Sequence, residues 1–263
     1  MLQREKLILM MLLGMLVFSP LSGLSAELTG RQIMTLVDEC PDGEDRISRM
    51  KMTLINNRGR ERVRELKSFS KDYGKDKKTV MVFEAPADVR DTAFLSWEYD
   101  DPGRDDDKWL YLPALKKERR ISGSGKNDYF MGSDFTYDDM GDRNVDEDTH
   151  TLLGEETVQG HDCWKIESVP IDPDDMYTRK RLWVSKEAHM VVQAEYYDKD
   201  GLLKVYRALE ISKQGGFWTL FRSEMDNVSR SHKTLWQVES VTYDSGLEDR
   251  LFRVATIQRG AIR

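Results

Sequence analysis

Acidic side chains gather in three short runs of the sequence, and clustered carboxylates are the groups from which calcium sites and acid–base centres are built. The runs are DDPGRDDD at 100–107, DRNVDED at 142–148 and DPDD at 172–175. None of them has the alternating aspartates, central glycine and terminal glutamate of a calcium-binding loop. Because runs of like charge are typical of solvated loops, we expect hairpin turns here and no metal site.

The other residue patterns that could support catalysis are incomplete. His150, His161, His189 and His232 are scattered along the chain, and none is part of a His-Glu-x-x-His zinc motif. The stretch SGSGK at 122–126 is similar to a phosphate-binding loop, but it lacks the first required glycine and the Ser or Thr after the lysine. No Gly-x-Ser-x-Gly nucleophile elbow is present. The sequence therefore predicts no catalytic residue, no metal and no cofactor.

The segment FMGSDFTYDDM, residues 130–140, mixes aromatic and methionine side chains with three aspartates. It has neither the alternation of a strand nor a long helical period. Three interpretations are open at this point: a metal loop, a catalytic acid cluster, or a cover over an apolar surface. The catalytic interpretation requires Asp134 and Asp138 to converge in a pocket beside a perturbed base.

The N-terminus has the features of a secretory signal peptide. Arg4 and Lys6 precede an apolar run from Leu7 to Phe18, and small residues follow up to Ala26. A run of this length is too short to cross a bilayer, which requires about 20 residues. An uncleaved anchor that extends to Leu24 is the alternative. We expect cleavage near Ala26 and export to the periplasm.

The remaining residues, 27–263, are long enough for one large all-β domain, and no Pro- or Gly-rich linker divides them. We expect a single soluble domain and a monomer. The whole chain has 40 basic and 47 acidic residues, a formal net charge of −7. This balance argues against nucleic acid, and against an anionic membrane surface, as the main partner.

One amphipathic helix is predicted at the start of this domain. Thr29 and Gln32 form a capping box, apolar residues including Leu36 recur at helical spacing, and Pro41 ends the helix after Cys40. Cys40 lies on the apolar face, where a free cysteine behaves as a small buried side chain. A disulfide with Cys163 is the alternative in an oxidising compartment.

After the helix the apolar pattern changes to period two and predicts many short strands joined by tight turns. Such a pattern favours an antiparallel sheet that curls, with the helix on its concave face and Leu36 at the contact. The predicted strands lie near residues 49–55, 62–72, 77–85, 92–99, 107–115, 150–158, 161–169, 178–185, 190–198, 202–211, 217–228 and 234–246.

Six stretches stand in this order along the chain: LTGRQIM, MTLINNRGRERVRELKSF, KDKKTVMVFEAPADVRDTAFL, DKWLYLPALKKERRIS, FMGSDFTYDDM and LLGEETVQGHDCWKIE. In this order they resemble the periplasmic outer-membrane lipoprotein-sorting proteins related to the LolA and LolB carriers. The resemblance covers most of residues 27–263. It implies a mainly β fold, a curved antiparallel half-barrel with helices that close its open side. It also implies a carrier that shields the acyl chains of a lipoprotein or another lipid, with an inner-membrane transporter as a possible partner.

An acyl chain requires only a water-poor surface of adaptable side chains, and methionine and aromatic residues provide one. We therefore interpret residues 130–140 as a movable lid whose aspartates face solvent, and we expect strand residues to line the cavity beneath it. The predicted lining residues are Met52, Phe83, Trp97, Trp109 and Tyr111, and the predicted lid residues are Phe130, Met131, Phe135, Tyr137 and Met140.

Two alternatives to the carrier remain open. One is a non-catalytic docking subunit of an envelope transporter. The other is an enzyme that modifies an envelope lipid or glycan.

Overall fold

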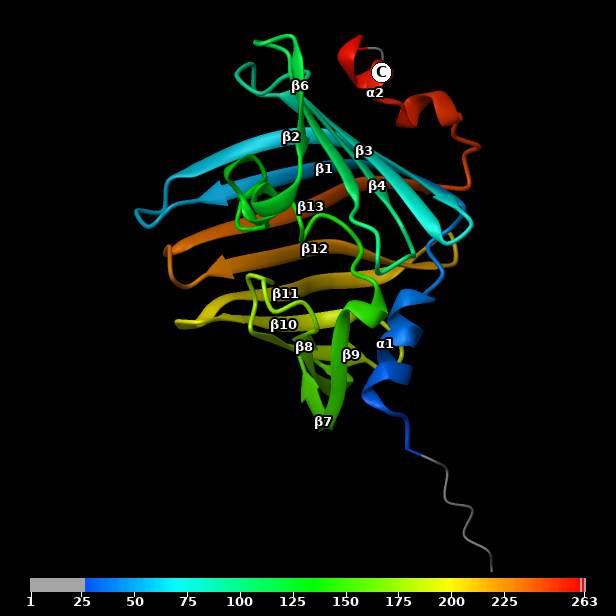
Figure 1. Cartoon of the computed structure of the whole chain (residues 1–263), viewed down its shortest axis with the longest axis vertical. Coiled ribbons are helices and arrows are strands. Elements are labelled where there is room, and N and C mark those ends of the chain that lie inside the picture. The colour runs from blue at the N-terminus through cyan, green and yellow to red at the C-terminus, as the bar shows by residue number, and fades with distance from the viewer. Residues whose placement is uncertain (1–26, 261, 263) are drawn as a thin grey trace, which may run out of the picture.

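A single antiparallel sheet of thirteen strands dominates the described part of the chain. The computed structural model describes residues 27–260 and 262, so the predicted signal peptide lies outside the described residues. The sheet is strongly curved and wraps around a concave interior (Figure 1). The strands follow the order β6-β5-β4-β3-β2-β1-β13-β12-β11-β10-β9-β8-β7. The prediction of a mainly β fold with a curved antiparallel sheet is confirmed.

The first and last strands of the chain, β1 and β13, pair in the middle of this open sheet and join its two halves. The strands are β1 (Asp45–Ile55), β2 (Glu61–Tyr73), β3 (Asp76–Ala85), β4 (Ala93–Glu98), β5 (Asp107–Leu112), β6 (Lys117–Ile121), β7 (Asp148–Val158), β8 (His161–Pro170), β9 (Arg179–Ser185), β10 (Val191–Asp198), β11 (Gly201–Gln214), β12 (Phe217–Asn227) and β13 (His232–Tyr243). The β6 strand, KERRI, was not predicted. It is an edge strand whose first four residues are exposed, so it has no apolar alternation.

The strand registers define two opposite ends of the sheet. Ile55 at the end of β1 lies opposite Lys233 at the start of β13, and Asn227 at the end of β12 lies opposite His232. The β1–β2, β10–β11 and β12–β13 turns therefore project at one end, which we call the hairpin end (Figure 1). The β2–β3, β4–β5 and β11–β12 turns lie at the opposite end.

Helix α1 (Gly30–Asp38) starts with the predicted capping box, in which Thr29 and Gln32 satisfy each other's backbone donors. Its Ile33 side chain is fully buried in a cluster that includes Ile166 and Leu182. The helix lies against β7 and β8 (Figure 1). Leu36 is only half-buried and is not part of this cluster, so Ile33 and not Leu36 makes the central contact.

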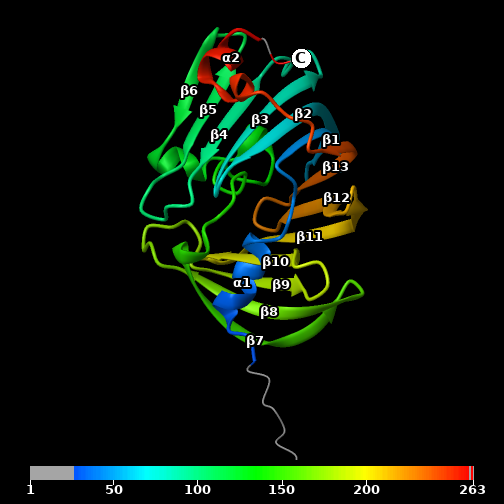
Figure 2. The same cartoon turned by 90° about the vertical axis from the view of Figure 1, so that its right-hand side faces the viewer.

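The convex face of the sheet is covered as well. The C-terminal segment, with η4 (Asp249–Phe252) and α2 (Val254–Gln258), packs on β3, β4 and β5 (Figure 2). Phe252 and Ile257 are buried there. Apolar side chains are therefore needed on both faces of these strands, which explains why β4 is buried at nearly every position.

The two cysteines are free: Cys40 lies beside the Ala188 carbonyl, and Cys163 is buried beside Trp183. Among the described residues, neither helix is long and apolar enough to cross a membrane.

Candidate functional site

Residues 130–140 lie inside the concave face of the sheet, and we call this segment the plug. Its backbone folds back on itself, because the Phe130 N–H donates to the Phe135 carbonyl at 2.7 Å. Met131 and Gly132 form the reversal with φ angles of 47° and 76°, a conformation that glycine adopts readily and methionine adopts only with strain. Residues 133–137 are all buried. The segment is thus an internal part of the fold at the hairpin end.

The aromatic side chains of the plug form one buried cluster with the concave face. The Phe130 side chain is 0% exposed, and its ring centroid lies 5.3 Å from that of Phe94 and 5.6 Å from that of Tyr137. The Phe135 ring packs against Trp236. Seven of the predicted site residues meet in this cluster: Met52, Phe83, Phe130, Met131, Phe135, Tyr137 and Met140.

Three predicted lining residues lie elsewhere. Trp97, Trp109 and Tyr111 belong to a cluster on the convex face, under the C-terminal segment. The Trp97 indole N–H donates to the Phe252 carbonyl at 2.8 Å. Their placement in the cavity was therefore wrong, since odd-numbered residues of β4 and β5 point away from the concave interior.

A cavity of about 690 Å³ remains on the concave side, between the plug, helix α1 and the sheet. Its floor is formed by short hydroxyl side chains that are buried yet leave space above them: Ser48, Ser68, Ser70, Thr79 and Ser223. Its apolar wall includes Met34, Val37, Met50, Met81, Met140, Leu182 and Tyr206. Sequence reasoning missed the floor, although the alternating serines of SFS at 68–70 are a detectable signal.

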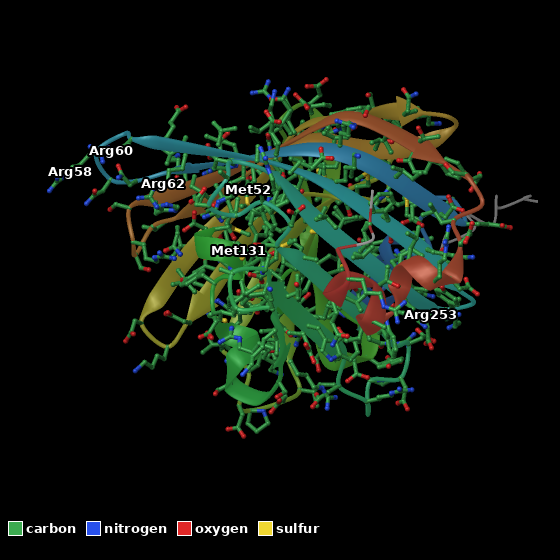
Figure 3. The ribbon with its side chains drawn as sticks, turned by 90° about the horizontal axis from the view of Figure 1, so that it is seen from above. Met52, Arg58, Arg60, Arg62, Met131 and Arg253 are labelled. Carbon is green, nitrogen blue, oxygen red and sulfur yellow. The ribbon has the colours of Figure 1, made fainter. Side chains whose placement is uncertain are left out.

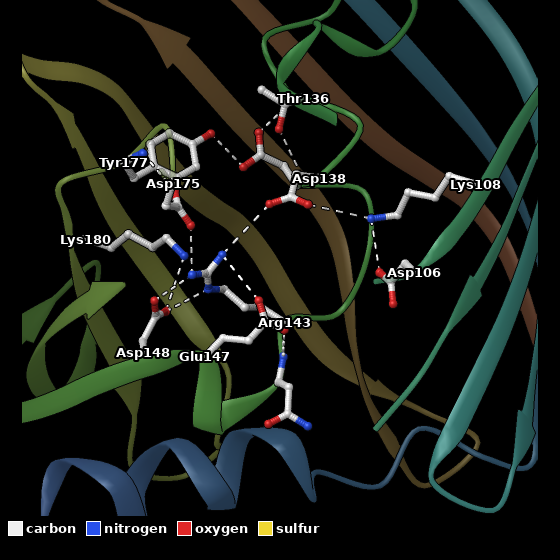
Figure 4. A network of polar contacts seen from close by, with 12 residues as sticks. Asp106, Lys108, Thr136, Asp138, Arg143, Glu147, Asp148, Asp175, Tyr177 and Lys180 are labelled. Atoms are coloured by element: carbon white, nitrogen blue, oxygen red, sulfur yellow. Dashed lines mark hydrogen bonds and ion pairs between the residues drawn. The ribbon is translucent and has the colours of Figure 1, made fainter. Parts of the chain in front are cut away.

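One wall of the cavity is charged (Figure 4). The Arg143 guanidinium binds the carboxylates of Asp148 and Asp175 at 2.7 and 2.9 Å. Lys180 lies 3.4 Å from Asp148, and Asp138 lies 3.9 Å from Lys108. The cavity is therefore amphipathic, with methionines on one side and paired charges on the other.

A buried ion pair anchors the plug to the sheet. The Lys204 ammonium, on β11, lies 2.5 Å from the Asp139 carboxylate and 3.1 Å from the Asp134 carbonyl. The Asp139 carboxylate also accepts the Thr136 N–H and the Tyr177 hydroxyl, at 2.6 and 2.8 Å. The predicted outward orientation of the plug aspartates was thus wrong for Asp139, because its charge is matched inside the protein. It was also wrong for Asp134, which is 0% exposed and bonded to His232 and Thr234.

The pKa values of the pair reflect this environment. Burial raises the pKa of Asp139, but the Lys204 ammonium and the hydrogen bonds outweigh burial and hold it below its usual value. Burial also lowers the pKa of Lys204, against the attraction of Asp139. The carboxylate has three partners, so we describe the pair as ionic.

The two aspartates required for a catalytic centre do not converge. Asp134 is fully buried and does not line the cavity. Its carboxylate accepts hydrogen bonds from the Thr234 hydroxyl and from the His232 ring, at 2.7 and 2.6 Å. Asp138 lines the cavity and lies in the charged wall. In the described part of the chain, no group of three or more His, Cys, Asp or Glu side chains is arranged to hold a metal ion.

Glu98 is a buried carboxyl group on the cavity wall, near the end opposite the hairpin end. Burial and the neighbouring Asp142 carboxylate raise its pKa from 4.5 to about 7. The folded protein therefore holds this proton more tightly than the unfolded chain. As pH rises from 4.5 to about 7, the unfolded chain releases the proton first and folding stability falls.

Replacing Glu98 with glutamine should remove this loss of stability. At pH 8 we expect the variant to be more stable than the wild type by roughly 2–3 kcal/mol, and at pH 4 we expect almost no difference. Urea unfolding across this pH range measures the effect. The same substitution at the exposed Glu210 is the control, and equal pH profiles for wild type and Glu98→Gln would contradict the prediction.

Comparisons with known proteins agree with this architecture. A family model described as "Uncharacterized protein" matches residues 75–259. The structure of a DUF1329 family protein from Desulfovibrio piger is similar, with 34% identity, a TM-score of 0.83, and coverage of 87% of this chain and 97% of that one. No curated protein matches.

Two further solved structures share the fold. A putative outer membrane lipoprotein-sorting protein domain from Vibrio parahaemolyticus has 29% identity and a TM-score of 0.82, over 88% of this chain and 98% of that one. A LolA superfamily protein from Nitrosomonas europaea has 19% identity and a TM-score of 0.68, over 87% and 99%. At this identity the second likeness concerns the fold alone.

Proposed function

Because the chain belongs to the DUF1329 family and shares its fold with a lipoprotein-sorting domain, we propose that it is a carrier for lipids. In this proposal the cavity shields the acyl chains of a lipoprotein or another lipid during transfer toward the outer membrane. The protein acts in the periplasm as a monomer, after cleavage near Ala26, and receives its cargo from an inner-membrane transporter.

The observation that carries the proposal is the amphipathic cavity on the concave face. Its volume of about 690 Å³ lies within the range of small-molecule sites, roughly 300–1,000 Å³. The methionines of its apolar wall adapt to ligands of variable shape. An acyl chain can lie along this wall, and a polar head group can hydrogen bond with the charged wall. This arrangement suits an amphiphile better than a hydrocarbon alone.

The same geometry favours a non-catalytic role. A hydrolase or transferase requires an acid, a base or a nucleophile placed at one reacting atom. Asp134 is bonded to His232 and Thr234 outside the cavity lining, and the charges of Arg143 and Asp138 are used in ion pairs. We therefore propose a carrier in preference to an envelope-modifying enzyme.

The plug limits the depth of the cavity, since its aromatic side chains pack on the concave face at the hairpin end. In our proposal, longer cargo displaces the plug and reaches the apolar surface under it. Burial of one methylene group is worth about 0.8 kcal/mol, so a long acyl chain can offset the contacts that the plug loses.

Filling the floor of the cavity should block binding. Ser68 is buried and lies between Ser48 on β1 and Met81 on β3, so Ser68→Phe places a phenyl ring in the space above the floor. We expect a fluorescent fatty acid to bind at least about 10-fold more weakly, the loss of roughly two buried methylene groups. Fluorescence titration measures this effect.

The matched control is Ser240→Phe, an exposed position on β13 outside the cavity lining. It should bind the fatty acid as the wild type does. If Ser68→Phe and Ser240→Phe bind the fatty acid with equal affinity, the cavity is not the lipid site. Thermal unfolding of both variants shows whether either one fails to fold.

A further inference from the structure

Four arginines alternate along the β1–β2 hairpin, at positions 58, 60, 62 and 64. Side chains two apart on a strand share one face and are roughly 7 Å apart. Arg64 points to the concave side, where its guanidinium lies over the Phe83 ring and donates to the Met131 carbonyl. Alternation places Arg62 on the same side, and Figure 3 shows Arg58, Arg60 and Arg62 along the projecting hairpin.

None of these four guanidinium groups has an ionic partner among the described residues, within a limit of 4.0 Å. The neighbouring acids Glu61 and Glu65 alternate onto the opposite face of β2. The other face of the same two strands behaves differently. Arg49 and Lys67 both pair with Glu84 there, at 3.6 and 2.9 Å. The hairpin thus presents unpaired positive charge in a chain that is negative overall.

The turn that carries the outer arginines has a defined shape. The Asn56 side-chain oxygen accepts the backbone N–H groups of Arg58 and Arg60, at 2.9 and 3.0 Å. Gly59 has a φ of 72°, which favours glycine at this position of the turn. The backbone of this turn is therefore ordered, and the side chains of Arg58 and Arg60 that it carries are exposed.

Exposed apolar side chains concentrate at the same end of the sheet. Of the eight large apolar side chains that the described residues expose, six lie in or beside turns and strand ends at the hairpin end. The β5–β6, β8–β9, β10–β11 and β12–β13 turns contribute most of them. They are Val63, Leu115, Val169, Ile171, Leu202 and Val228.

We propose that the hairpin end is a membrane-docking surface, on which Arg58, Arg60 and Arg62 bind the phosphates of anionic lipid head groups. Guanidinium groups recognise phosphate with paired hydrogen bonds, and each basic side chain near an anionic bilayer adds to binding. The exposed apolar side chains enter the interface between head groups and acyl chains. Over distances beyond about 8 Å salt screens the remaining charges, so the net charge of −7 does not prevent local binding.

A bilayer fits these observations better than an acidic protein partner. The arginines and apolar side chains are spread over several projecting turns and do not frame one concave pocket. Docking in this orientation also turns the plug toward the membrane, because Arg64 holds the Met131 carbonyl at the plug's reversal. Lipid could then enter the concave interior through the plug. The docking surface itself does not depend on the identity of the cargo.

Vesicle binding tests the proposal without cargo. The probe is a vesicle of phosphatidylcholine that contains about one third phosphatidylglycerol, and the protein is the chain that starts at Glu27. We expect this chain to cosediment at low salt and to dissociate at high salt. The triple variant Arg58→Gln, Arg60→Gln, Arg62→Gln should bind roughly 100-fold more weakly. Pure phosphatidylcholine vesicles should bind neither protein.

The control variant removes the same number of charges from exposed positions outside the hairpin end that have no ionic partner among the described residues: Arg104→Gln, Lys213→Gln, Arg253→Gln. It should bind as the wild type does. The proposal is overturned if the wild type does not bind anionic vesicles, or if both triple variants lose binding equally. In the first case, retention on an immobilised acidic protein would assign the surface to a protein partner. Fatty-acid binding by the hairpin variant should be unchanged, which separates this result from a failure of the carrier proposal.

Discussion

Replacing Lys204 with methionine should lower the free energy of unfolding by about 3–5 kcal/mol. Lys204 is 0% exposed, and methionine has a similar length, so the main loss is electrostatic. The substitution leaves the buried Asp139 carboxylate without its cation, with only the Thr136 N–H and the Tyr177 hydroxyl as partners. Urea unfolding at neutral pH, followed by circular dichroism, measures the change.

The double variant Lys204→Met, Asp139→Asn provides the control. It removes both charges, and replacing a whole buried pair by neutral groups is often nearly neutral in stability. We expect it to recover most of the loss. If the single variant loses less than about 1 kcal/mol, the ion pair does not anchor the plug.

Replacing Phe130 with alanine should cost about 3–5 kcal/mol of stability, the usual range for a buried phenylalanine. Its ring is fully buried and lies in contact with Phe83, Phe94 and Tyr137. The sequence predicted a movable lid, and the side chains of a lid contribute little to the core. Under that interpretation Phe130→Ala would hardly change the free energy of unfolding, so the unfolding curve distinguishes the two interpretations.

The adjacent, half-buried Met131 is the matched position for this test. Met131→Ala should cost about 1 kcal/mol, because part of its side chain already contacts solvent. If Phe130→Ala and Met131→Ala lower the free energy of unfolding by the same small amount, the segment is a loosely packed lid. A large difference between them supports its description as a plug.

The fold could be predicted to a considerable extent, because strands and tight turns leave a clear period in the sequence. The capping box of Thr29 and Gln32 and the alternation of β1 were both informative. The face on which a side chain lies was less predictable. In AFLSWE, residues 93–98, almost every position is buried, since the C-terminal segment covers the convex side. Alternation of polar and apolar residues therefore could not place Trp97, Trp109 and Tyr111.

The candidate site was predicted only in its apolar part. Lys204 lies within LLKVYRAL, and a lysine between apolar strand residues is most simply interpreted as solvent-facing. Its partner Asp139 lies 65 residues away in sequence, and a single sequence does not reveal that pairing. The serines of the floor were missed for a related reason. They matter because they leave space, and only the surrounding elements determine how much space remains.

The central claim is that the concave cavity holds acyl chains. Mass spectrometry of lipids extracted from the protein, after purification from its native cells, tests it most directly. We predict a bound acyl-chain lipid in the wild type and in Ser240→Phe, and a clear loss of that lipid in Ser68→Phe. Wild-type protein without lipid, or the same lipid content in Ser68→Phe as in the wild type, would contradict the claim.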